Sequence, residues 1–281
     1  MLFRLTLLII IATLLHIQTA GAVKIVRLEL EYGSDIVATG GFDIPKTNKT
    51  LDLELYDDIT PVTVANYLNY VNNGHYDLTF INRSVPGFVL QTGGVTNIDP
   101  DNTGLGPTTF GVVPEFSPIV NEPGLSNIRG TIAMAKLSDQ PDSATNEWFI
   151  NLNDNSNMLD NNNGGYTVFG SIIDDGMDVA DQIATFPLMD ISLIFGPSYS
   201  SIPIPDYDTS TSEILYQSNL VMILSANEID RPILRFTPTD GDFDFANAIV
   251  NPIDVVLKNT GNETLDIGDL SSVTANTPYI I

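Results

Sequence analysis

The sequence contains no cysteine, which excludes disulfides and any thiol-based chemistry. It has only two histidines, and His16 lies in an N-terminal segment that we expect to be removed, so His75 would be the only one left. A lone histidine argues against histidine-based zinc sites and against a Ser-His-Asp triad. We therefore expect chemistry that needs no metal and no cofactor.

Positive charge is also scarce, with 11 Lys and Arg against 35 Asp and Glu and a formal net charge of −24. Between residues 51 and 228 the only cations are Arg83, Arg129 and Lys136. So acidic a surface repels phosphate backbones, and we expect no nucleic-acid partner. Solubility is the main interpretation of the charge, and divalent-cation binding is the weaker alternative.

Residues 1–22 have the features of a secretion signal. Arg4 provides the positive start, residues 5–15 form an apolar run too short for a stable membrane span, and Ala20-Gly21-Ala22 is a cleavage site. We predict a mature chain that begins near Val23, is periplasmic or secreted, and has no membrane contact after cleavage. An uncleaved anchor is the alternative. The lack of cysteine fits a bacterial exported protein better than a eukaryotic extracellular domain.

Hydrophobic periodicity predicts strands at both ends of the first 228 residues and two helices between them. Residues 23–32 and 51–56 alternate as strands expected to pair, and the apolar run 219–226 is expected to be a strand that pairs back into the first domain. One helix begins at Thr60-Pro61, with Thr60 as its N-cap, and ends at Gly74. The other follows Asp174 or Asp175 and carries an apolar stripe that includes Met177, Ala180 and Ile183.

The most informative stretch is Phe80-Ile-Asn-Arg-Ser-Val-Pro-Gly-Phe-Val-Leu-Gln-Thr-Gly-Gly94. Arg83 stands there among apolar residues, where a guanidinium is costly to bury unless it is hydrogen-bonded. Gln91 adds an amide that donates and accepts, and Pro86-Gly87 marks a turn. The pattern predicts a small apolar pocket with one fixed positive donor at its rim. The structural alternative is an interior arginine paired with a carboxylate.

This stretch resembles the signature of the cyclophilins, peptidyl-prolyl isomerases with the pattern Phe-x-x-Arg-x-x-Pro-Gly-Phe-x-x-Gln-x-Gly-Gly. Three further blocks resemble the same family in the same order. They are Arg129-Gly-Thr-Ile-Ala-Met-Ala135, Ser143-Ala-Thr-Asn-Glu-Trp-Phe-Ile-Asn151 and Gly165-Tyr-Thr-Val-Phe-Gly170. The resemblance implies a mainly β fold over residues 23–228, a closed eight-stranded antiparallel barrel capped by two helices.

The resemblance also implies roles for individual residues. Arg83 would be the donor to the prolyl nitrogen, and Phe88 and Gln91 would complete the catalytic set. The remaining substrate contacts would come from residues of the slot and the neighbouring groove: Val89, Ala135, Lys136, Glu147, Phe149, Met158, Leu159 and Tyr166. The implied partners are Pro-containing polypeptides, and no cofactor is implied.

Two positions depart from the family pattern. Glu147 stands where the family usually has Gln, and the residues alone leave open whether its carboxylate pairs with Arg83 or orients it. Met158 stands where many eukaryotic members have Trp, which implies weak cyclosporin binding. The oxygen-rich run 153–165 faintly resembles a calcium loop, but the required spacing and closing Glu are missing.

Residues 229–281 change in character and resemble part of an immunoglobulin-like β-sandwich. They are too few for a complete sandwich, so either the chain is truncated here or the segment packs on the first domain or on another chain.

Three functions follow as hypotheses. The first is an isomerase that assists the folding of exported polypeptides. The second is a non-catalytic module that binds Pro-containing segments, and the third is a surface or adhesive protein whose C-terminal segment carries the function.

Overall fold

The computed structural model describes residues 23–33, 46–97, 109–196, 199–205, 217–230, 234–238 and 255–259. The strands are β1 Lys24–Tyr32, β2 Thr47–Leu55, β3 Thr79–Phe80, β4 Arg83–Val85, β5 Val89–Thr92, β6 Val95–Asn97, β7 Phe110–Val112, β8 Thr131–Met134, β9 Trp148–Asn151, β10 Val168–Ile172, β11 Leu188–Met189, β12 Ile202–Pro203, β13 Met222–Ile229, β14 Leu234–Pro238 and β15 Val255–Asn259. The helices are α1 Pro61–Asn72, α2 Ser156–Leu159, α3 Gly176–Ala184 and α4 Ser192–Phe195, with 3₁₀ turns at Asn162–Gly164 and Gln217–Asn219.

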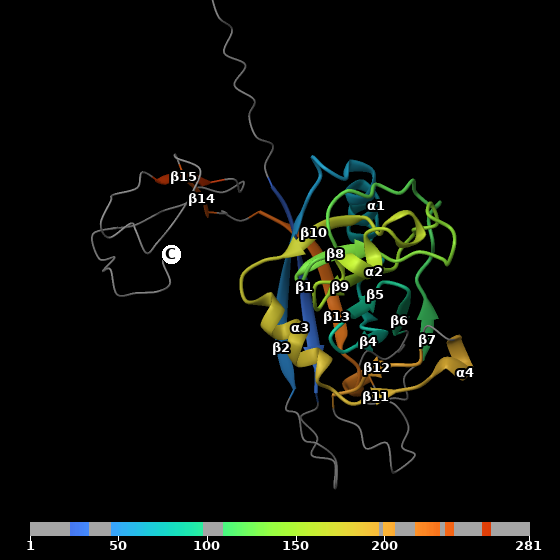
Figure 1. Cartoon of the computed structure of the whole chain (residues 1–281). Helices are drawn as coiled ribbons and strands as arrows, with labels where there is room; N and C mark the ends of the chain where they lie inside the picture. Colours follow the sequence, from blue (N-terminus) through green and yellow to red (C-terminus); the bar gives the residue numbers. More distant parts are fainter. Residues whose placement is uncertain are drawn as a thin grey trace, which may run out of the picture. The chain divides into compact units, whose positions relative to one another are not determined.

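Eleven strands form one antiparallel sheet in the order β4-β5-β9-β8-β10-β2-β1-β13-β3-β6-β7. The sheet curls around a core that α1 covers at one end, and α3 packs beside β2 (Figure 1). The predicted mainly β fold is confirmed. The predicted closed barrel of eight strands is not confirmed, because no pairing in the described residues joins the end strands β4 and β7, and short strands raise the count to eleven.

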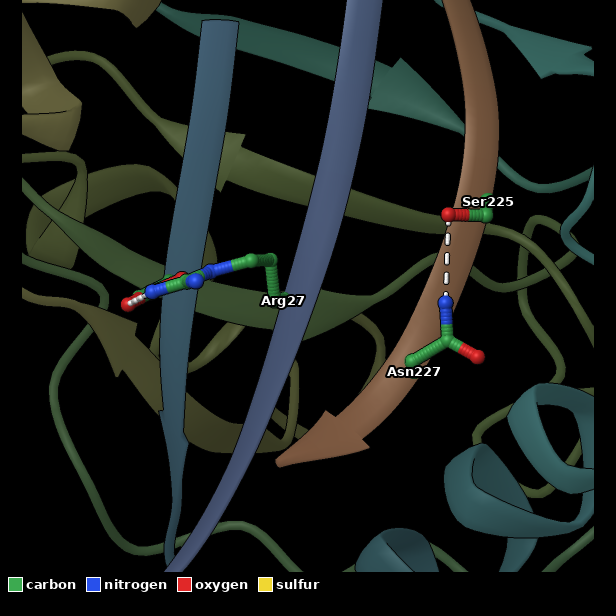
Figure 2. Close-up of polar contacts among 4 residues, drawn as sticks. Arg27, Ser225 and Asn227 are labelled. Carbon is green, nitrogen blue, oxygen red and sulfur yellow. Dashed lines mark hydrogen bonds and ion pairs between the residues drawn. The ribbon is translucent and has the colours of Figure 1, made fainter. Parts of the chain in front are cut away.

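The predicted strand pairings are confirmed in the middle of this sheet. β1 pairs antiparallel with β2 on one side and with β13 on the other. Val26, Leu28 and Leu30 are buried on the inner face of β1, as the alternation predicts. On the outer face, Arg27 reaches across to Asp52 of β2, while Asn227 donates to Ser225 within β13 (Figure 2).

Both predicted helices are present, but α1 is capped differently from the prediction. Thr60 precedes α1 and makes no side-chain capping hydrogen bond. The Glu122 carboxylate instead accepts from the backbone N–H groups of Val62 at 3.2 Å and Thr63 at 2.8 Å. An anion from a distant loop therefore satisfies the first turn, where the helix dipole favours negative charge. None of the helices in the described ranges is long and apolar enough to cross a membrane.

The chain divides into two compact units near residue 232. The first unit holds the eleven-stranded sheet, and β14 pairs antiparallel with β15 in the second. This pair is consistent with the β-rich character expected of residues 229–281. Most of the predicted C-terminal segment 229–281 and the whole of the predicted signal 1–22 lie outside the described residues, so both boundaries stay predictions.

Candidate functional site

The register of four neighbouring strands places the candidate site on the outer face of the sheet. Arg83 of β4 pairs with Gln91 of β5, Gln91 with Phe149 of β9, and Phe149 with Ala133 of β8. Directly paired residues share a face, and so do residues two apart on one strand. The alternate residues, such as Trp148, are buried in the core beneath. The period of two therefore separates the site from the core.

A cavity of about 940 Å³ opens on this face. Ten of the eleven residues that the sequence predicted for the site line it: Arg83, Phe88, Val89, Gln91, Ala135, Lys136, Glu147, Phe149, Leu159 and Tyr166. We call this cavity the groove. Met158 is not among the lining residues, and its side chain is 55% exposed. α2 buries Leu159 and leaves the Met158 side chain exposed, so the contact of Met158 with a substrate stays a prediction.

One part of the groove is an apolar slot. Val89, Phe149 and Leu159 are buried in one hydrophobic cluster, with Phe88 and Tyr166 packed against it. The rings of Phe149 and Tyr166 meet edge to face, with centroids 5.9 Å apart. A slot walled by aromatic and branched side chains suits a compact apolar ring such as that of proline.

Arg83 lies at the rim of this slot and makes no ion pair within the described part of the chain. Its Nη1 donates to Oε1 of Gln91 at 3.4 Å, and its side chain is half-buried. The alternative of an interior arginine neutralised by a carboxylate is therefore not what the structure shows. A guanidinium has five N–H donors, so most of them are left for a ligand in the groove.

Glu147 makes no direct ion pair with Arg83 but is linked to it through the Gln91 amide. Its Oε2 accepts from Nε2 of Gln91, and its Oε1 accepts from the hydroxyl of Tyr199 at 3.2 Å. Burial raises the pKa of Glu147, while the hydrogen bonds from Gln91 and Tyr199 act in the opposite direction. The sequence left open whether Glu147 pairs with Arg83 or orients it. In the structure the Gln91 amide lies between the Glu147 carboxylate and the Arg83 guanidinium.

Lys136 lines the groove but is occupied with the neighbouring loop. Its Nζ donates to the carbonyls of Gly165 at 2.6 Å and Asn163 at 2.9 Å, and it lies 4.7 Å from the centre of the Tyr166 ring. Burial lowers the pKa of Lys136. This ammonium therefore stabilises the wall that carries Tyr166 instead of reaching freely into the groove.

The sequence did not predict the second half of the lining, which consists of Glu115, Pro118, Leu137, Gln140, Pro141, Asp142, Ser143, Thr145, Asn146, Tyr199 and Ser200. Ser143, Thr145 and Asn146 lie inside a recognised block, and residues 137–142 lie between two blocks, so proximity in the chain was an available signal. Tyr199 and Ser200 had no such signal, because they lie outside all four recognised blocks. In the described residues, no group of three or more His, Asp or Glu side chains could hold a metal ion.

Comparison with known proteins adds the family. The sequence profile described as "Cyclophilin type peptidyl-prolyl cis-trans isomerase/CLD" matches residues 42–194. The chain belongs to the cyclophilin family.

Several bacterial proteins named peptidyl-prolyl cis-trans isomerase are similar to this chain. A peptidyl-prolyl cis-trans isomerase of Acinetobacter baylyi is 41% identical over 147 residues, which cover 50% of this chain and 71% of the relative. Isomerase A of Dickeya dadantii is 39% identical over 157 residues, covering 54% of this chain and 73% of its own. Isomerase B of Escherichia coli is 37% identical, covering 47% and 76% respectively.

Among solved structures, a cyclophilin-type isomerase of Cryptosporidium parvum covers 75% of this chain and 99% of its own. Its sequence identity is 21% and the TM-score is 0.46. The family match of the cyclophilin profile ends at residue 194, so Tyr199 lies beyond the matched residues.

Proposed function

We propose that this cyclophilin accelerates the cis–trans rotation of Xaa-Pro bonds in polypeptides. The observation that carries the proposal is the Arg83 guanidinium, which stands without an ion pair in the described residues at the rim of an apolar slot. The family membership and the names of the similar isomerases support the same activity.

Catalysis of this rotation needs only that the prolyl ring and one hydrogen-bond donor are held in the correct positions. The Xaa-Pro bond resists rotation because the nitrogen lone pair is delocalised into the carbonyl, with a barrier of roughly 18–20 kcal/mol. In the twisted state the lone pair is localised on the prolyl nitrogen and accepts a hydrogen bond. A slot that holds the ring and a donor aimed at that nitrogen stabilise the twisted state more than either planar state.

Each part of the site has a place in this scheme. The slot of Val89, Phe149 and Leu159 holds the prolyl ring, and Arg83 donates to the prolyl nitrogen. Arg83 suits this task because it stays charged and because Gln91 can hold one of its N–H groups while others donate. No proton, nucleophile or metal is consumed.

The test is exchange spectroscopy by NMR on a short peptide with one Xaa-Pro bond and catalytic amounts of protein. We expect fast exchange with the natural chain and near-background exchange with Arg83→Ala. Arg129→Ala is the matched control, because Arg129 forms an exposed pair with Asp181 and does not line the groove. Equal exchange with Arg83→Ala and the natural chain would overturn the assigned role.

A non-catalytic groove that binds Pro-containing segments is the second candidate. Gln91 favours this candidate, because both ends of its amide are already hydrogen-bonded. Its oxygen accepts from Arg83 and its nitrogen donates to Glu147. Peptide resonances that shift on titration without any exchange would support this candidate, and Glu147→Gln would then be tested for recovered turnover.

We also propose that the substrates are exported polypeptides and that the protein acts in the periplasm or outside the cell. Arg4, the apolar run 5–15 and the Ala20-Gly21-Ala22 site support this. Mass spectrometry of the protein from a periplasmic or culture fraction should find a mature chain that begins near Val23. Weak cyclosporin binding is part of the same proposal, since Met158 replaces the Trp of many eukaryotic members and is turned to solvent.

A further inference from the structure

The starting point is a chain of three hydrogen bonds that joins four side chains of the groove. Tyr199 donates to Glu147, Gln91 donates to the other oxygen of Glu147, and Arg83 donates to the carbonyl oxygen of Gln91. The chain begins at the segment that follows α3 and ends at the guanidinium that faces the prolyl slot.

The charge of Glu147 decides how the amide of Gln91 is turned. An ionised carboxylate only accepts, so the –NH₂ end of Gln91 must face Glu147 and the carbonyl end must face Arg83. A glutamine at position 147 would accept either end of the amide. Glu147 therefore fixes the one amide orientation in which Gln91 presents an acceptor to Arg83.

The fold holds both partners of Glu147 in place. Gly94 leaves the room that the carboxylate needs, since a Cβ at Gly94 would lie 2.1 Å from Oε1 of Glu147. The backbone of Tyr199 is bonded at both ends, with its carbonyl accepting from Ile191 at 3.0 Å and its N–H donating to Gly196 at 3.1 Å. The hydroxyl thus approaches Glu147 from an anchored backbone.

The segment that carries Tyr199 is itself fastened to the sheet. β11 and β12 pair with each other, and the carbonyl of Ser201 accepts from the N–H of Ser84 in β4 at 2.7 Å. Ile202 and Ile204 are buried in a second hydrophobic cluster beside Phe80, against which Tyr199 packs. This segment is therefore a built wall of the groove.

From this geometry we propose that Tyr199 is a positioning residue of the active site, which acts through Glu147 and Gln91 to orient Arg83. The role rests on the proposed isomerase function. It also gives a role to Glu147, which departs from the family's usual Gln. The Glu147 carboxylate accepts the hydrogen bond that the Tyr199 hydroxyl donates.

A pH dependence follows, because a protonated Glu147 also donates and no longer fixes the amide of Gln91. The groups that act on Glu147 are Gln91 of β5, Tyr199, Arg83 of β4 and the carboxylate of Glu115. Burial and Glu115 raise the pKa of Glu147, whereas Gln91, Tyr199 and Arg83 lower it. Loss of the Tyr199 hydroxyl therefore raises this pKa further, and activity should be lost at a higher pH on acidification.

The experiment measures kcat/KM against pH for the natural chain, Tyr199→Phe, Glu147→Gln and the double variant. We expect Tyr199→Phe to lower kcat/KM at neutral pH by roughly three- to tenfold, an effect the size of one ordinary hydrogen bond. The acid limb of the pH profile, which is the fall in kcat/KM on acidification, should lie at higher pH in Tyr199→Phe than in the natural chain. In Glu147→Gln the acid limb should disappear, and adding Tyr199→Phe to it should change nothing further.

Tyr32→Phe is the matched control, because it removes one tyrosine hydrogen bond, to Gln182 at 3.0 Å, away from the groove lining. It should leave both kcat/KM and the pH profile unchanged. The proposal is overturned if Tyr199→Phe keeps the natural acid limb, or if it costs as much activity with Gln as with Glu at position 147.

A second readout does not depend on turnover. The side-chain amide resonances of Gln91 should shift as Glu147 titrates, with a midpoint that moves to higher pH in Tyr199→Phe and stays in Tyr32→Phe. If the natural chain shows no isomerase activity, the proposed function fails, while this titration still decides whether Tyr199 acts on Gln91 through Glu147. Gln91 resonances that do not respond to pH would overturn the positioning role.

Discussion

At the scale of single residues, two neighbouring tyrosines differ in one hydrogen bond. Tyr67 and Tyr76 are both buried, and their ring centroids lie 5.3 Å apart. The hydroxyl of Tyr76 donates to the carbonyl of Asn146 at 2.9 Å, whereas that of Tyr67 has no partner among the described residues. A buried polar group without a partner loses its hydration and gains nothing in return.

Tyr67→Phe should therefore stabilise the protein by about 1 kcal/mol, since it removes the unpaired hydroxyl and keeps the ring. Tyr76→Phe is the matched variant and should destabilise it by about 1–2 kcal/mol, because the Asn146 carbonyl loses its donor. Urea denaturation measures both free energies of unfolding. A loss from Tyr67→Phe as large as that from Tyr76→Phe would show that the Tyr67 hydroxyl is paired.

At the scale of elements, two bidentate ion pairs differ in burial. Arg27 of β1 binds Asp52 of β2 through two contacts of 2.8 Å, and the Asp52 side chain is only 7% exposed (Figure 2). Arg129 binds Asp181 of α3 in the same manner, but Asp181 is 49% exposed. Water screens the second pair and its charges lose little when separated.

Asp52→Asn should cost about 2 kcal/mol of stability, because it weakens charge-assisted bonds to a carboxylate that is itself buried. Asp181→Asn is the control and should cost less than about 1 kcal/mol. Thermal and urea unfolding of both variants, at low and high salt, measure the difference. Equal costs would mean that burial of Asp52 adds nothing to its pair.

At the scale of the whole molecule, every described residue of the groove lies in the compact unit that spans residues 23–232. A chain that ends at Pro232 should therefore keep the unfolding temperature of this unit and its rate of Xaa-Pro exchange. Differential scanning calorimetry and NMR exchange on the shortened and natural chains check this. A shortened chain that folds but has lost its activity would show that the C-terminal segment takes part in the function.

The sequence by itself determined the mainly β fold and ten of the groove residues through its resemblance to the cyclophilins, and both long helices through their periodicity. Alternation along each strand explains the faces, since Gln91 and Phe149 point outward where Leu90 and Trp148 point inward. The sequence did not show that Met158 is exposed, because one residue around a short helix separates the buried face from solvent.

Only the tertiary structure decided what Glu147 does and what caps α1. The Tyr199–Glu147 contact joins residues 52 apart in the chain, and the Glu122–Val62 contact joins residues 60 apart. Such contacts leave no periodic pattern in the sequence. Each depends on where a distant loop packs against the sheet, and not on the residues next to it in the chain. The motif therefore placed Arg83 and Gln91, and the packing of the segment after α3 decided which way their hydrogen bonds run.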